Sequence, residues 1–168
     1  DRSPSRGLGD VYKRQVLLFT FLFRVVNVNG QSMEDTIHNE DKVLLTNLFY
    51  EPENGDVVVI SRAQHFEEPI IKRVIATEGQ TLKIDFNTGD VYVDGVLLDE
   101  PYIKTPTTDN EGGEIPEVIP EGYVFVMGDN RGNSLDSRSE QIGLIDKRNI
   151  IGKAQYIVFP FDRIGGIG

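Results

Sequence analysis

The sequence predicts a mainly β fold. Short segments rich in β-branched and aromatic residues recur along the chain, which is typical of strands. Dipeptides such as Asn54-Gly55 and Asp94-Gly95 lie between these segments and favour tight turns. A chain of 168 residues is long enough for one compact domain with its own core, whereas two large domains would not fit.

The strand pattern occurs in seven segments, which cover residues 42–46, 56–60, 70–75, 81–84, 91–93, 123–127 and 154–159. In the third segment, alternation places Lys72 on one face with Ile70 and Val74, and it places Arg73 on the other. Either face is apolar enough to desolvate its basic residue. The third segment is therefore a candidate for a buried lysine.

One short helix and one loop region complete the expected domain. Residues 32–37 favour a short helix because Ser32 can cap its N-terminus and two acidic residues follow in the first turn. Residues 79–122 have room for a small hairpin and a loop only. Their Pro-, Thr- and Gly-rich part, residues 105–113, is expected to be a mobile surface loop.

The N-terminal part of the chain differs in character from the rest. Residues 16–23 are apolar, Arg24 interrupts the run, and Val25 and Val26 resume it. A bilayer span needs about 20 apolar residues, so we interpret residues 16–28 as the C-terminal end of a truncated membrane anchor. Residues 1–15 are charged and rich in Ser, Gly and Arg. We interpret them as a sequencing or cloning scar, with a genuine flexible tail as the alternative.

Composition excludes several classes of function. The net charge is −10 and no basic stripe is present, which argues against a nucleic-acid partner. The chain has no cysteine, and its two histidines, His38 and His65, are far apart in the sequence. The absence of cysteine excludes thiolate metal sites, and the two histidines offer few ligands for zinc. We therefore expect neither a metal nor a cofactor.

The most informative segment is residues 128–138, which are almost entirely polar and follow directly on the apolar strand 123–127. Together with Ser32 and Lys72 it offers a hydroxyl, an amine and a carboxylate–guanidinium pair. A serine hydroxyl needs a base to become a nucleophile, and a lysine can serve if burial lowers its pKa. Each residue also has a simpler explanation. Ser32 could be a helix cap without a catalytic role, and Lys72 could be an edge-strand residue whose ammonium group reaches water.

Taken together, these segments resemble a known family. Gly-Gln-Ser-Met at residues 30–33, Gly-Asp-Val-Val-Val at 55–59, Lys-Arg-Val-Ile at 72–75, Gly-Asp-Asn-Arg at 128–131 and Asn-Ser-Leu-Asp-Ser-Arg at 133–138 are similar to the ordered motifs of bacterial type I signal peptidases. The similarity extends over residues 16–168 and points to the compact Gram-positive-like form. It implies a fold of short antiparallel strands like that of signal peptidases and self-cleaving repressors, with residues 29–168 as the catalytic domain.

The resemblance also implies roles for individual residues. Ser32 would be the nucleophile, and its backbone amide would be one oxyanion-hole donor. Lys72 would be the general base, and Ser134 would orient it. Asp136 and Arg138 would form a supporting ion pair.

The other motif residues are expected to support the site. Position 30 carries a hydroxyl in some members of the family, and Gly30 leaves the second oxyanion-hole donor open. The remaining supporting positions are Met33, Arg73, Asp129, Asn130 and Arg131.

The function implied by this resemblance is that of a serine endopeptidase that removes signal peptides. Its partners would be membrane lipid and exported preproteins with small residues at positions −1 and −3, bound in extended form at a strand edge. It would be a single-pass protein of the cell membrane with its catalytic domain on the extracytoplasmic side. Two alternatives are a self-cleaving repressor-type peptidase, for which the expected DNA-binding helices are missing, and a catalytically inactive cell-surface binding domain.

Overall fold

The computed structural model describes residues 23–168 and is mainly β, as predicted. The strands are β1 (Phe23–Asn27), β2 (Lys42–Thr46), β3 (Val57–Ile60), β4 (Ile70–Thr77), β5 (Leu82–Asp85), β6 (Asp90–Val93), β7 (Val96–Leu97), β8 (Tyr123–Met127), β9 (Ile145–Asp146), β10 (Ile150–Phe159) and β11 (Gly165–Gly166). Three short 3-10 helices, η1 (Arg131–Asn133), η2 (Lys147–Asn149) and η3 (Phe161–Arg163), lie among the described residues.

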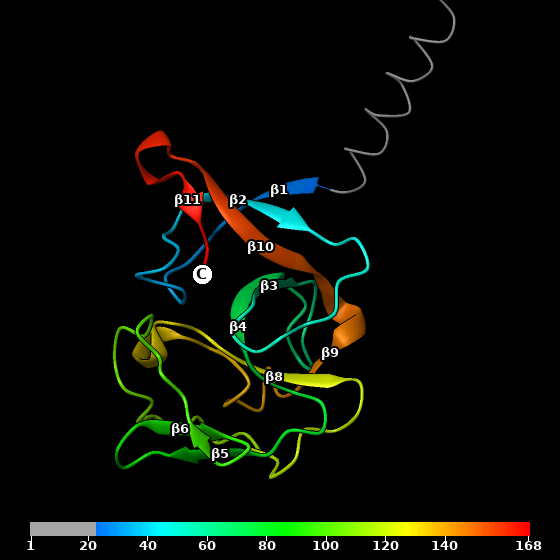
Figure 1. Cartoon of the computed structure of the whole chain (residues 1–168), viewed down its shortest axis with the longest axis vertical. Coiled ribbons are helices and arrows are strands. Elements are labelled where there is room, and N and C mark those ends of the chain that lie inside the picture. Colours follow the sequence, from blue (N-terminus) through cyan, green and yellow to red (C-terminus); the bar gives the residue numbers. More distant parts are fainter. Residues whose placement is uncertain (1–22) are drawn as a thin grey trace, which may run out of the picture.

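The strands form two antiparallel sheets within the described part of the chain. The larger sheet has the order β1-β2-β10-β3-β4-β8-β9, with β11 paired to β10, and the smaller has the order β5-β6-β7. In Figure 1, β1, β2 and β10 form the upper part of the molecule, β3, β4 and β8 the middle, and β5 and β6 the bottom. The small sheet lies within residues 79–122, where the sequence predicted a hairpin and a loop.

Three hydrophobic clusters stabilise this arrangement. One lies among β2, β3 and β10 and includes Met33 and Ile37 from the segment that follows β1. A second includes residues of β3, β4 and β8, and a third joins β4 and β8 to the small sheet. Because β3 and β4 are buried along almost their whole length, they provide a rigid support for a polar site at their edge.

The boundary predicted for the membrane anchor is wrong from residue 23 onward. Residues 23–27 form strand β1, and Val25 pairs with Leu44 of β2. Their apolar character fits a strand as well as a helix end, and the pairing with β2 satisfies their backbone groups. Residues 1–22, with the rest of the anchor prediction and the scar prediction, lie outside the described residues. From residue 23 to the last residue, no helix is long and apolar enough to cross a membrane.

The helix predicted at residues 32–37 is also wrong, because these residues form a turn. A single helix-like hydrogen bond joins the Ile37 amide to the Met33 carbonyl at 2.9 Å. Met33 and Ile37 both enter the core, while the Thr36 hydroxyl donates to Asp129 at 2.5 Å. Long-range contacts therefore fix this segment more strongly than helix propensity does.

Candidate active site

Ser32, the predicted nucleophile, lies on a loop that is anchored in the core by its neighbour Met33. Met33 is 1% exposed and packs in the cluster formed by β2, β3 and β10, while its neighbour Ser32 is half-buried. Two residues before Ser32, Gly30 has a φ of 105°, a conformation that glycine adopts without a Cβ penalty. Its amide donates to Asn39 Oδ1 at 2.8 Å. The loop therefore presents the Ser32 hydroxyl while Met33 anchors it.

Lys72 reaches this hydroxyl from the large sheet. It lies on β4 opposite Val58 of β3, is 3% exposed, and its Nζ donates to Ser32 Oγ at 2.6 Å. The alternative of a lysine that reaches water is therefore not supported. Two residues 40 positions apart in the sequence form a hydroxyl–amine pair in a largely dry setting.

Burial changes the proton affinity of this lysine. Desolvation of the ammonium form lowers the pKa of Lys72 from 10.5 to about 8, whereas the negative charges of Asp136, Glu111 and Asp129 oppose this shift. A buried ammonium group has lost most of its hydration, so the neutral amine becomes the more accessible form. Lys72 is therefore suited to accept a proton near neutral pH.

The polar segment after β8 holds the Ser32 loop through backbone contacts. The Asn130 amide donates to the Ser32 carbonyl at 2.9 Å, and Asn130 Nδ2 donates to the Gln31 carbonyl at 3.0 Å. Gly128 makes this close approach possible, because a Cβ there would collide with the Ser134 hydroxyl and the Ser32 carbonyl. The segment thus sets the position of the hydroxyl relative to β4.

Asp136 organises the other side of this segment. Its Oδ1 accepts from Arg138 Nε at 2.9 Å, and its Oδ2 accepts from Arg138 Nη2 at 2.9 Å. Oδ2 also accepts from the Gly128 amide at 3.0 Å and from the Ser134 hydroxyl at 2.8 Å. The Asp136–Arg138 pair is fully buried. That Ser134 orients Lys72 stays a prediction, since its hydroxyl donates to Asp136 in this structure.

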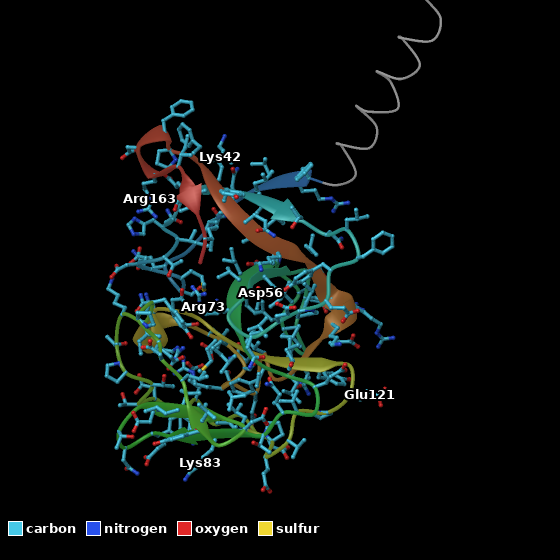
Figure 2. The ribbon with its side chains drawn as sticks, in the orientation of Figure 1. Lys42, Asp56, Arg73, Lys83, Glu121 and Arg163 are labelled. Atoms are coloured by element: carbon cyan, nitrogen blue, oxygen red, sulfur yellow. The ribbon has the colours of Figure 1, made fainter. Side chains whose placement is uncertain are left out.

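A second buried pair joins β4 to the same segment. Arg73 Nε and Nη2 donate to Asp129 Oδ1 and Oδ2 at 2.8 and 2.7 Å, which is a two-point fork. The Arg73 guanidinium also stacks 3.9 Å from the ring centre of Tyr102. Figure 2 shows Arg73 near the middle of the molecule. Because Arg73 directly follows Lys72 on β4, this fork also fixes the backbone position of Lys72.

A third buried pair was missed in the sequence. Arg131 donates to Glu100 through Nη1 at 3.2 Å and Nη2 at 2.6 Å, and Nη1 also contacts the Thr107 hydroxyl. Glu100 lies in the segment expected to be an insertion, and no pattern there marks it.

The polar groups at this site are well satisfied. Throughout residues 23–168, each buried side-chain nitrogen or oxygen atom has a hydrogen-bond partner. The Ser32 backbone N–H, in contrast, donates to no other group of this described region. It is free to bind an oxygen atom of a substrate. The arrangement can therefore combine a nucleophile, a base and at least one oxyanion donor.

A separate cleft of about 880 Å³ lies away from this pair. Its lining comes from the loop around His65, the segment around Pro116 and Pro120, the first residue of β8, and β9. Neither Ser32 nor Lys72 lines it. The chemistry of the Ser32–Lys72 pair is thus located outside this cleft.

Comparison with known proteins gives consistent results. The family model described as "Signal peptidase, peptidase S26" matches residues 11–159, and it begins inside the segment 1–15 that the sequence set apart. Signal peptidase I of Bacillus licheniformis is 33% identical over an alignment of 162 positions, and the match covers 89% of this chain and 83% of that protein. A protein of Synechocystis named probable signal peptidase I-1 is 37% identical over an alignment of 164 positions, and the match covers 91% of this chain and 80% of that protein.

A solved structure is also similar. The crystal structure of a signal peptidase I from Enterococcus faecalis V583 has a TM-score of 0.50 and 25% sequence identity to this chain. The match covers 62% of this chain and 97% of the other.

Proposed function

The chain belongs to the signal peptidase family, peptidase S26, and on this premise we propose that it is a membrane-anchored endopeptidase that cleaves signal peptides through a Ser32–Lys72 dyad. Membership makes it an enzyme of the serine peptidase class that acts on signal peptides. The observation that carries the mechanistic proposal is the 2.6 Å hydrogen bond between Lys72 Nζ and Ser32 Oγ.

In the first step, neutral Lys72 accepts the proton of the Ser32 hydroxyl while Oγ attacks the carbonyl carbon of the scissile peptide bond. The carbonyl oxygen takes the negative charge, and the Ser32 backbone N–H donates to it. The Lys72 ammonium then returns the proton to the leaving amine as the C–N bond breaks. An acyl-enzyme remains on Ser32.

In the second step, Lys72 accepts a proton from a water molecule that attacks the ester carbonyl. Collapse of the new tetrahedral intermediate breaks the bond to Oγ, and the proton passes from Lys72 to Ser32. The free enzyme is restored with one water consumed. With a pKa of about 8, about one Lys72 in ten is neutral at pH 7 and ready to begin this cycle.

An open strand edge supports the binding of an extended substrate. Ile70, Ile71 and Lys72 pair with β3 on one side, and the pairing of β4 with β8 begins only at Arg73. In the part of the chain that the structure describes, the other edge of Ile70 and Ile71 has no strand partner. A signal peptide that pairs there would run directly past Ser32. Small residues at positions −1 and −3 are part of this proposal.

The apolar residues 16–23 support the membrane anchor. Residues 16–22 of this run precede β1 directly in the sequence, and β1 lies beside β2 at the top of the molecule in Figure 1. A single anchor at this end would hold the catalytic domain against lipid on the extracytoplasmic side, where cleavage sites emerge.

Cleavage of a peptide with an Ala-x-Ala site by the full chain in detergent tests the proposal. We expect a single cut after the second Ala, located by mass spectrometry, and its loss in Ser32→Ala and Lys72→Ala. Lys83→Ala is a matched control, because Lys83 lies on β5 of the small sheet (Figure 2). Normal turnover by Lys72→Ala would remove this residue from the mechanism. No cleavage by folded, anchored protein would favour the binding-domain alternative.

A further inference from the structure

A segment outside the motifs contacts every part of the dyad site. Residues 100–107, here called the strap, follow β7 and precede β8. In the strap, the Lys104 amide donates to the Asp129 carbonyl at 3.0 Å. The Lys104 ammonium group lies 3.3 Å from Glu34 Oε2, two residues after Ser32. The strap therefore reaches both the polar segment after β8 and the loop of the nucleophile.

The second half of the strap is held against the polar segment. The Gly132 amide donates to the Thr105 hydroxyl oxygen at 3.2 Å. Thr107 is 0% exposed, and its hydroxyl accepts from Arg131 Nη1. The sequence predicted a mobile surface loop at residues 105–113, and the first residues of that loop are tied to the site.

Tyr102, in the first half of the strap, covers Arg73 of β4. The edge of the Arg73 guanidinium is occupied, because Nε and Nη2 donate to Asp129. Its Nη1 donates to the backbone oxygen atoms of Gly55 at 2.7 Å and Gly168 at 3.0 Å. A guanidinium face forms no such hydrogen bonds but can lie against an aromatic ring. The Tyr102 ring occupies this position, with its centre 3.9 Å from the guanidinium carbon.

The Tyr102 hydroxyl contacts a second buried ion pair. It donates to Glu100 Oε1 at 3.2 Å, and the same oxygen accepts from Arg131 Nη2 at 2.6 Å. Burial raises the pKa of Tyr102, and so does the Glu100 carboxylate, so the hydroxyl stays protonated and remains a donor. The ring of this tyrosine thus contacts one ion pair of the site, and its hydroxyl contacts another.

We propose that Tyr102 is a positioning residue for the cleavage reaction. Its ring restricts the Arg73 side chain to the geometry that forms the fork with Asp129. Because Arg73 directly follows Lys72 on β4, a looser fork would let the amine drift from the Ser32 hydroxyl, which it meets at 2.6 Å. This inference rests on the proposed function of the dyad, and it assigns a role to a residue that the motifs do not include.

Loss of the ring should slow turnover more than it weakens substrate binding. Tyr102→Leu keeps an apolar side chain but removes the aromatic face. A cation–π contact to a desolvated guanidinium contributes enough to change a rate about tenfold. Since the proposed effect is on the alignment of the reacting groups, kcat should fall about tenfold while KM stays within about twofold of the wild type.

The test is steady-state cleavage of the Ala-x-Ala peptide by the full chain in detergent. Tyr102→Phe retains the ring and should keep kcat within about threefold of the wild type. Tyr92→Leu is the matched control, because Tyr92 is a half-buried tyrosine of β6 whose ring has Lys83 Nζ at 5.9 Å. Its kcat should stay within about twofold of the wild type.

A double-mutant cycle shows whether Tyr102 acts through Arg73. In an Arg73→Lys background the planar fork is already lost, so the addition of Tyr102→Leu should lower kcat less than about threefold. Equal losses with and without Arg73→Lys would overturn the inference. A Tyr102→Leu variant with wild-type kcat, or with a loss in KM alone, would also overturn it while leaving the dyad proposal intact.

A second readout needs no cleavage and separates this inference from the proposed function. Hydrogen exchange of the Arg73 Nε–H can be followed by NMR, and Tyr102→Leu should accelerate it about tenfold if the ring holds the fork closed. An unchanged exchange rate would contradict the role of the ring. If the folded, anchored wild type cuts no peptide, the proposed function fails, and this exchange rate still decides whether Tyr102 holds Arg73 on Asp129.

Discussion

Replacement of Gly128 by alanine tests how the site is assembled. No left-handed conformation is involved at Gly128, so a Cβ there is a purely steric change. The new methyl group would lie 2.6 Å from Ser134 Cβ and would also overlap the Ser134 hydroxyl and the Ser32 carbonyl. To relieve the overlap, the Ser32 loop and the Ser134 turn must move apart.

The size of the effect follows from these contacts. Overpacking of a filled interior costs about 1–3 kcal/mol, which for a chain of this length corresponds to a fall in Tm of about 3–10 °C. The Ser32 carbonyl accepts from Asn130 at 2.9 Å, and the adjacent hydroxyl meets Lys72 at 2.6 Å. A displacement of about 1 Å between reacting groups costs on the order of 100-fold in rate. We therefore expect kcat/KM to fall about 100-fold.

The assay is peptide cleavage together with thermal unfolding, and Gly132→Ala is the matched control. Gly132 lies in η1, four residues after Gly128, and its nearest neighbour to an added Cβ would be Thr105 Oγ1 at 3.4 Å. That contact is close to ordinary packing, so Gly132→Ala should stay within about twofold of wild-type activity. A Gly128→Ala variant with wild-type Tm and activity would refute the reasoning that close packing at Gly128 positions Ser32.

Three further predictions concern charge. The kcat/KM of the wild type should rise with pH through about 8 and then level off, because Lys72 acts as the neutral base and its pKa is lowered to about 8; an acid limb near 10 would contradict a desolvated lysine. Asp136→Asn should lower the stability by about 3–5 kcal/mol in chemical denaturation, since it leaves the buried Arg138 uncompensated, and an unchanged denaturation midpoint would remove that role. Arg73→Lys should reduce kcat/KM about tenfold because an ammonium cannot form the two-point fork to Asp129, and peptide cleavage at wild-type rate would show that the fork does not position Lys72.

The sequence was most informative where local pattern and fold agree. Alternation in residues 70–75 placed Lys72 and Arg73 on opposite faces of a strand, and β4 has this arrangement. The resemblance to signal peptidases also linked Lys72 to Ser32, which lies in another motif. The pairing of Arg73 with Asp129 was not predicted and is a finding of the structure. Strong β-branched runs next to Gly-containing turns made most of the long strands predictable.

Other features depended on contacts that no local pattern encodes. Strand β1 resembles the end of an apolar helix in sequence, and only its pairing with β2 distinguishes the two. Residues 32–37 have helix-start chemistry, yet Met33 and Ile37 must reach the core while Thr36 reaches Asp129. Glu100 and Glu111 lie in an acidic loop region without a recognisable motif. Their ion pairs with Arg131 and Arg138, respectively, depend on the folded structure and cannot be inferred from the sequence.

The three guanidinium–carboxylate pairs also explain why so polar a segment is buried. A buried pair contributes little net stability, because desolvation offsets most of its attraction. What these pairs supply is direction: Arg73 ties β4 to Asp129, Arg138 closes the turn that holds Ser134, and Arg131 ties the same segment to Glu100. Each pair fixes a different part of β4 or of the polar segment after β8. Replacing any one of them with apolar residues could preserve the fold, but it would release one of the constraints that hold the hydroxyl and the amine 2.6 Å apart.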